Sequence, residues 1–154
     1  MRQDPRVPEA ERFAREILPP VSRTFALSIR VLPGTLGRAV MTAYLLCRIA
    51  DTLEDAPGMP AAEKGALLDE LLRCFDDPAA AESFPSFLDG LGGDDTHVRL
   101  ARHAPLVFVL YRDLPESTRA HVRRWVCEMI VGMKKFVLLY PNGIRIQSLD
   151  EYRE

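Results

Sequence analysis

The sequence lacks the features that would assign it to several common functional classes. It has no block of about five or six basic residues, and its formal net charge is −2, so nucleic acid is not expected as a partner. Its longest apolar runs, 107–111 and 136–140, are far short of the roughly twenty residues that span a bilayer. The N-terminal segment mixes charged residues with prolines where a signal peptide has an apolar core. We therefore expect a soluble, cytoplasmic protein.

Cysteine is scarce and widely spaced. Cys47, Cys74 and Cys127 form no CxxC pair, which argues against a disulfide framework or a structural zinc site and fits a reducing compartment. His97 and His103 would fall on different faces of a helix that contained both, so we do not interpret them as a metal pair.

Strand-like alternation of apolar and polar residues is absent, and the apolar period is helical almost throughout. We expect a single all-α domain over residues 1–154, a helical bundle with short connections. Pro19 and Pro20 should end the first helix, because proline cannot donate a backbone hydrogen bond, and Ser22 is a good N-cap for the second. The expected helices cover approximately 9–18, 22–32, 35–55, 60–75, 83–93, 96–112 and 115–140.

The last residues of the sequence indicate the start of another helix. Ser148, followed three residues later by Glu151, forms a capping box after the break at 141–143. The new helix would reach Glu154 after about two turns, which is too short to be stable alone. We therefore expect the chain to be a fragment of a longer protein.

The helix expected over 35–55 ends in three acids, within the stretch YLLCRIADTLED. Its polar residues are spaced by four, three and four positions and so share one stripe: Tyr44, Arg48, Asp51 and Asp55. Glu54 lies at the edge of this stripe. Leucine and isoleucine fill the neighbouring faces, which is typical of an interior helix, so the stripe should face the interior or a cleft.

Three carboxylates at the C-terminal end of a helix oppose its dipole, at a cost of a few tenths to about 1 kcal/mol each at exposed positions. One arginine offsets only part of this cost. A divalent cation would supply the missing charge, since Mg²⁺ is commonly held by one or two carboxylates together with substrate phosphates. The stripe therefore predicts a magnesium-diphosphate site with Arg48 directed at the phosphates. The spacing also leaves open an ordinary salt-bridged helix end in solvent.

Three motifs, in this order, resemble the squalene/phytoene synthase family: Ser22-Arg23-Thr24-Phe25, the acid-ended block 44–55, and Met129-x-x-Gly132-Met133 with Phe136. The acid-ended block is the most specific of them, and the resemblance runs from about Pro20 to Glu154. It implies an all-α isoprenoid-synthase fold around a central cavity for two prenyl diphosphates. It also implies Mg²⁺-dependent head-to-head (1'-1) condensation through a cyclopropylcarbinyl diphosphate.

The acid-ended block has the form DTxED, which resembles the squalene-forming members more than the phytoene-forming ones. This implies farnesyl diphosphate as the substrate and squalene or a related C30 product, with NADPH as the reductant if squalene is formed. A lipid product would suit peripheral association with a membrane. The alternatives are a phytoene-type synthase that uses geranylgeranyl diphosphate, and a non-catalytic helical domain that binds an isoprenoid or a protein. The oligomeric state is not implied.

The resemblance also implies roles for the matched residues. The catalytic residues would be Tyr44, Arg48, Asp51 and Asp55. Magnesium would be held by Asp51 and Asp55, with Glu54 as a further ligand or the partner of one. The diphosphate would be bound by Ser22, Arg23 and Arg48. The prenyl pocket would be lined by Phe25, Met129, Gly132 and Met133.

Several of these residues have a structural alternative. Ser22 could serve only as an N-cap, Phe25 and Met129 only as core residues, and Gly132 only as a close helix contact. Family members also carry a second aspartate-rich block on a later helix, which does not occur in this sequence, since Asp150 and Glu151 are explained by the helix start. We therefore expect activity to require residues beyond these 154, unless a partner chain supplies them or the protein is a decayed relative.

Overall fold

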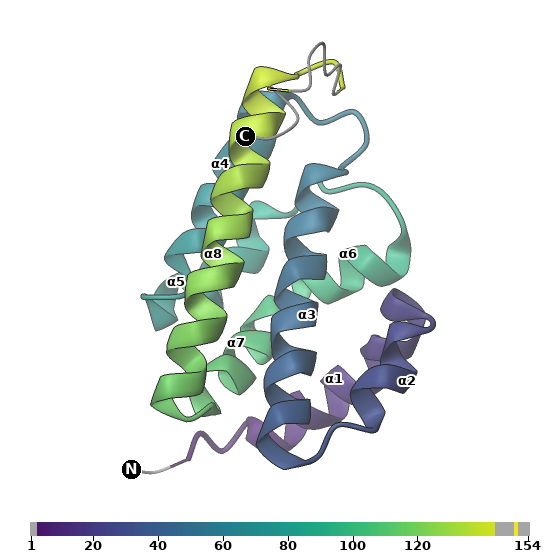
Figure 1. Ribbon diagram of the computed structural model, residues 1–154. Coiled ribbons are helices and arrows are strands. Elements are labelled where there is room, and N and C mark those ends of the chain that lie inside the picture. The colour runs from purple at the N-terminus through teal and green to yellow at the C-terminus, as the bar shows by residue number, and fades with distance from the viewer. Residues whose placement is uncertain (1–2, 144–149, 151–154) are drawn as a thin grey trace.

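The structure, a computed structural model, describes residues 3–143 and 150, and all regular structure in them is helical (Figure 1). The helices are α1 Val7–Ser22, α2 Phe25–Arg30, α3 Gly34–Glu54, α4 Ala61–Arg73, α5 Pro78–Ser83, the short 3-10 helix η1 Phe84–Phe87, α6 Asp95–Arg102, α7 Ala104–Asp113 and α8 Glu116–Leu139. The expected all-α class is confirmed. The capping box predicted from Ser148 and Glu151 lies outside the described residues.

Helix α3 is the central element of the bundle. It packs against α1, α4, α6, α7 and α8, and its large aliphatic side chains Leu45, Leu46, Ile49 and Leu53 are fully buried. A helix that is apolar around most of its circumference is expected at the centre, because each such side chain gains about 1.5–3 kcal/mol on burial. In Figure 1, α3 and α8 run side by side, the end of α8 lies beside the start of α4 at the top of the view, and a loop joins the end of α3 to α4.

Helix α8 covers one side of the bundle. Only Val126 and Ile130 of its side chains are buried, and it packs against α3 and α4. Trp125, Val131 and Leu139 are exposed on it. Among the described helices, none is both long and apolar enough to cross a membrane.

The predicted end of the first helix at Pro19 and Pro20 is wrong, because α1 continues to Ser22. The two prolines withdraw hydrogen bonds from the carbonyl groups of Arg15 and Glu16, which are exposed residues, so water can replace the missing donors. Ser22 is consequently not the N-cap of the second helix. Its hydroxyl donates to the Leu18 carbonyl at 2.6 Å, and α2 begins only at Phe25.

Two further predicted helices were also placed wrongly. The single helix expected over 96–112 is divided at His103, because Pro105 is the second residue of a new helix and cannot continue the old one. The helix expected over 83–93 is replaced by α5 and η1. Asp77 begins α5 as an N-cap whose carboxylate accepts from the Ala79 N–H at 2.9 Å, followed by Pro78 in the first turn.

Candidate functional site

The candidate site is the C-terminal half of α3, from Tyr44 to Asp55. The residues around its end come from three helices, since the start of α4 and the end of α8 lie beside it (Figure 1). A cavity of about 310 Å³ opens there. It is lined by two of the three acids, Glu54 and Asp55, and by basic and aromatic side chains from the neighbouring segments, among them Lys64, Phe136 and Tyr140.

Arg48 is held between two helices. Its Nη1 donates to Asp51 Oδ2 at 3.0 Å, and its Nη2 lies 3.3 and 3.4 Å from the two ring nitrogens of His97 on α6. Its Nε is buried and has no hydrogen-bond partner among the described residues. A buried donor without a partner costs about 1–3 kcal/mol, so this guanidinium retains unused capacity to bind an anion.

The acids of the stripe are not fully neutralised. Burial raises the pKa of Asp51, and repulsion from Asp55 raises it further, although the Arg48 charge opposes both effects. Burial also raises the pKa of Glu54, again with repulsion from Asp55 and Asp51, while Lys64 opposes it. Carboxyl groups with a raised pKa resist ionisation, so a positive charge beside Asp51 and Glu54 would stabilise their ionised forms.

Lys64 partly compensates for the unfavourable helix end. Its ammonium group, in the second turn of α4, donates to the Glu54 carbonyl at the end of α3. A cation in that position binds an otherwise unpaired carbonyl and interacts favourably with the helix dipole. The Lys64 charge also lowers the pKa of Glu54, but burial and repulsion from Asp55 and Asp51 outweigh this effect.

The described residues do not build a metal site from protein ligands alone. No three His, Cys, Asp or Glu side chains in this part of the chain converge closely enough to enclose an ion. Asp51 is paired with Arg48, whereas Glu54 and Asp55 line the 310 Å³ cavity. Mg²⁺ requires only one or two carboxylates when phosphates and water complete its coordination. The donor set therefore fits a cation shared with a bound diphosphate.

The corner between α1 and α2 is anchored to α3 through Tyr44. The Tyr44 hydroxyl donates to the Val21 carbonyl at 3.3 Å, and its ring stacks on that of Phe25 with a centroid distance of 4.9 Å. Arg23, at the corner itself, is exposed and has a left-handed backbone with φ of +48°. Ser22 donates to Leu18 instead, so it would have to exchange this bond before donating to a diphosphate.

The predicted prenyl-pocket residues of α8 lie on a different helix from the acids. Met129 and Met133 are half-buried and pack against the hydrophobic core. A Cβ at Gly132 would find no heavy atom within 4 Å, so a close helix contact is not the reason for this glycine. Helix α8 itself packs against both α3 and α4.

The structure also brings forward residues that the sequence did not single out. Val40 and Cys47 continue the stripe of Tyr44 and Asp51 at the same spacings and are half-buried. Burial raises the pKa of the Cys47 thiol to about 11, so at neutral pH this side chain is an uncharged lining group. Extending the stripe one turn upstream would have found Val40, and the same spacing within the stripe would have found Cys47. No local feature of the sequence points to His97, because only the packing of α6 against α3 brings it to Arg48.

These features define an all-helical protein whose central helix ends in an arginine-carboxylate site. The profile of the family Squalene/phytoene synthase matches residues 18–154, and the chain belongs to this family. The resemblance inferred from the motifs is thereby confirmed.

Among curated relatives, squalene synthase of Schizosaccharomyces pombe is 25% identical over 154 residues, which is 99% of this chain and 32% of the relative. Lycopaoctaene synthase of Botryococcus braunii is 33% identical over 141 residues, covering 92% of this chain and 30% of the relative. The chain thus spans about a third of the length of these relatives.

A solved structure described as the complex of TcSQS with the ligand BPH1237 has a similar fold. It superposes with a TM-score of 0.74 at 26% sequence identity, over 94% of this chain and 39% of that chain. A second structure, the complex of TcSQS with E5700, gives a TM-score of 0.75 at the same identity.

Proposed function

We propose that this chain provides the first acidic half of a prenyltransferase site that condenses two farnesyl diphosphate molecules head to head (1'-1). The product would be squalene or a related C30 hydrocarbon. The observation that carries the proposal is the Arg48-Asp51 pair beside Glu54, where both half-buried carboxyl groups, Asp51 and Glu54, have raised pKa values. The names of the curated relatives, squalene synthases and a lycopaoctaene synthase, support the same reaction class.

In this proposal each residue acts through the atoms described above. Arg48 turns its guanidinium, including the unpaired Nε, toward the diphosphate, and the exposed Arg23 approaches it from the α1–α2 corner. Tyr44 and Phe25 present stacked aromatic faces at the reacting end, which favour a developing allylic cation. Burial raises the pKa of Tyr44, so its hydroxyl stays neutral.

Asp51 and Asp55 would hold Mg²⁺, with Glu54 as a further ligand or its partner. Mg²⁺ bound there would supply positive charge that stabilises the departing diphosphate. The half-buried surfaces of Val40, Cys47, Met129 and Met133 would exclude water from the prenyl chains. The condensation releases one diphosphate and one proton and leaves a cyclopropylcarbinyl diphosphate. In squalene formers, a second ionisation and reduction by NADPH follow.

Two alternatives are distinguished by experiment. A phytoene-type enzyme would use geranylgeranyl diphosphate, whereas three of the curated relatives are named squalene synthases. A non-catalytic isoprenoid-binding or protein-binding domain remains the second alternative, because no enclosed metal site is formed by the described residues.

The product assay tests the proposal. The chain, both alone and within the longest reading frame that contains it, is incubated with farnesyl diphosphate, Mg²⁺ and NADPH, and the lipids are extracted. A C30 product is expected from the longer protein. A C40 product from geranylgeranyl diphosphate would favour the phytoene type, and no product from either substrate would refute the synthase proposal.

The variant Asp51→Asn should abolish turnover while leaving the fold intact. The substitution keeps the side-chain shape but removes a charge that an ion would require. Circular dichroism provides the control for folding. An unfolded Asp51→Asn protein would show that this residue is a structural ion-pair partner of Arg48 instead.

A further inference from the structure

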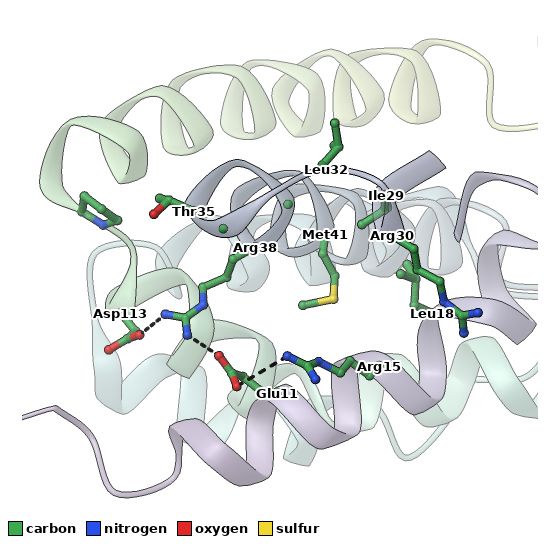
Figure 2. Close-up of a pocket in the computed structure, with 13 residues that line it drawn as sticks. Glu11, Arg15, Leu18, Ile29, Arg30, Leu32, Thr35, Arg38, Met41 and Asp113 are labelled. Carbon is green, nitrogen blue, oxygen red and sulfur yellow. Dashed lines mark hydrogen bonds and ion pairs between the residues drawn. The ribbon is translucent and has the colours of Figure 1, made fainter. Parts of the chain in front are cut away.

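A second cavity lies at the opposite end of α3 from the acids (Figure 2). Its volume is about 830 Å³, and it lies between α1, the α2–α3 turn, the N-terminal half of α3 and the turn from α7 to α8. In Figure 2, Arg38 and Met41 extend from α3 toward α1, and Arg15 extends from α1 toward Glu11. Binding sites for small molecules commonly occupy about 300–1,000 Å³.

This cavity is separate from the acid-ended site. Arg38 precedes Asp51 by thirteen residues, which corresponds to about 20 Å along a helix. None of the residues in the three family motifs lines it. A ligand held there would therefore not compete for the Arg48 guanidinium.

Positive charge exceeds negative charge in the cavity wall. Three arginines, Arg15, Arg30 and Arg38, face two acids, Glu11 and Asp113. Arg38 forms ion pairs with both acids: it pairs with Glu11, and its Nη1 lies 2.6 Å from Asp113 Oδ2.

The other two arginines, Arg15 and Arg30, form at most a weak ion pair with the described residues. Arg15 lies 4.0 Å from Glu11 with a side chain that is 75% exposed, and such a surface pair contributes little to stability. Arg30 is exposed and forms no ion pair with the described residues. Their two guanidinium groups are thus available to an anion.

The remaining wall is apolar. Leu18, Ile29 and Met41 are buried residues that line the cavity, and Leu32 adds half-buried surface at the α2–α3 turn. An apolar wall beside two available arginines is complementary to a molecule with an aliphatic chain and an acidic head. The guanidinium fork matches the oxygen spacing of a phosphate particularly well.

We propose that this cavity binds a single-chain amphiphile with a phosphate head. The chain lies against Leu18, Ile29 and Met41, and the phosphate is held by Arg15 and Arg30. The proposal is independent of the function proposed for the acid-ended site, because it uses other residues and requires no metal ion. The ligand is either a free alkyl or prenyl phosphate or a phosphate lipid at a membrane surface.

Calorimetric titration with decyl phosphate, below its micelle concentration and with EDTA present, tests the proposal. The wild-type chain should bind one equivalent of decyl phosphate. Inorganic phosphate, which lacks the alkyl chain, and decanol, which lacks the phosphate, should each bind at least about tenfold more weakly. The double variant Arg15→Gln/Arg30→Gln should lose about tenfold or more in affinity. The control Arg12→Gln/Arg102→Gln removes the same charge from exposed positions outside the cavity and should bind normally.

The site itself is identified by two further variants. Thr35→Trp, at an exposed position of the cavity wall, should block binding, whereas Arg48→Gln should leave it unchanged. Circular dichroism confirms that each variant is folded. Absence of binding, equal loss in the Arg12→Gln/Arg102→Gln control, or loss in Arg48→Gln would overturn the proposal.

Vesicles distinguish the two sources of the ligand. Flotation with phosphatidylcholine vesicles that contain phosphatidic acid, dependent on Arg15 and Arg30, would identify a membrane lipid. Binding of decyl phosphate without flotation would identify a free phosphate ester.

Discussion

At the scale of single residues, the site is organised by one arginine and the charge imbalance around it. Arg48 is bonded to Asp51 and lies beside His97, yet its buried Nε has no partner among the described residues. Burial raises the pKa values of the neighbouring acids Asp51 and Glu54, and repulsion among the acids raises them further. Binding sites are commonly less stable than they could be, because the missing interaction is reserved for a ligand.

Glu54→Gln should therefore stabilise the free protein. Folding raises the pKa of Glu54, so its ionised form is less favourable in the folded protein than in the unfolded one. The folded state is therefore favoured most below the usual carboxyl range, and this advantage is lost as the pH rises through the raised pKa. The variant should gain a few tenths to about 1 kcal/mol in unfolding free energy at pH 7 and nothing near pH 3. Urea denaturation at both pH values measures this. Glu128→Gln, at an exposed position of α8, is the control and should change little.

His97 should act by positioning Arg48. Its ring nitrogens lie within hydrogen-bond reach of Arg48 Nη2, so removing the ring frees the guanidinium to move. His97→Ala should weaken Mg²⁺-dependent binding of farnesyl thiodiphosphate by about three- to tenfold, and His97→Gln, which keeps an acceptor, should restore most of it. Fluorescence competition measures both affinities. Equal affinity in all three proteins would exclude the positioning role.

At the scale of elements, two glycines with opposite surroundings show how local packing decides a substitution. A Cβ at Gly37, in the first turns of α3, would lie 2.5 Å from the Leu32 carbonyl oxygen, so the α2–α3 turn requires glycine there. Gly132 in α8 has no heavy atom within 4 Å of the same position.

Gly37→Ala should lower the unfolding free energy by about 1–3 kcal/mol, because the turn must move to admit the methyl group. Gly132→Ala is the matched control and should raise it by up to about 1 kcal/mol through helix propensity. Thermal denaturation compares the two variants. Equal shifts in the two variants, or a stabilised Gly37→Ala with a destabilised Gly132→Ala, would contradict the packing described at both positions.

The sequence predicted the elements better than their boundaries. The helix over 35–55 was predicted almost to the residue, because its apolar faces and flanking prolines are local signals. The effect of prolines was predicted wrongly in two opposite ways. Pro19 and Pro20 were expected to end a helix but lie inside α1, whereas Pro105 divides a helix that was expected to be continuous. Whether a proline is tolerated depends on the exposure of the carbonyl it leaves unpaired, which the sequence does not state.

At the scale of the whole molecule, α3 connects two differently charged ends. Its acid-ended half meets α4, α6 and α8, and its N-terminal half lines the 830 Å³ cavity with α1 and α7. The stripe on α3 was predictable, because helical spacing alone defines it. Lys64 and His97 were not, because they reach α3 only through the packing of α4 and α6 against it.

Metal-dependent binding of a diphosphate at Asp51 tests the central claim most directly. Farnesyl thiodiphosphate, an unreactive analogue, is titrated calorimetrically into the chain with Mg²⁺ and with EDTA. The account predicts binding that requires Mg²⁺ and is lost in Asp51→Asn and Arg48→Gln, while the control Arg12→Gln binds normally. Binding that is equal with and without Mg²⁺, or unchanged in Asp51→Asn, would contradict the assignment of α3 as a magnesium-diphosphate site.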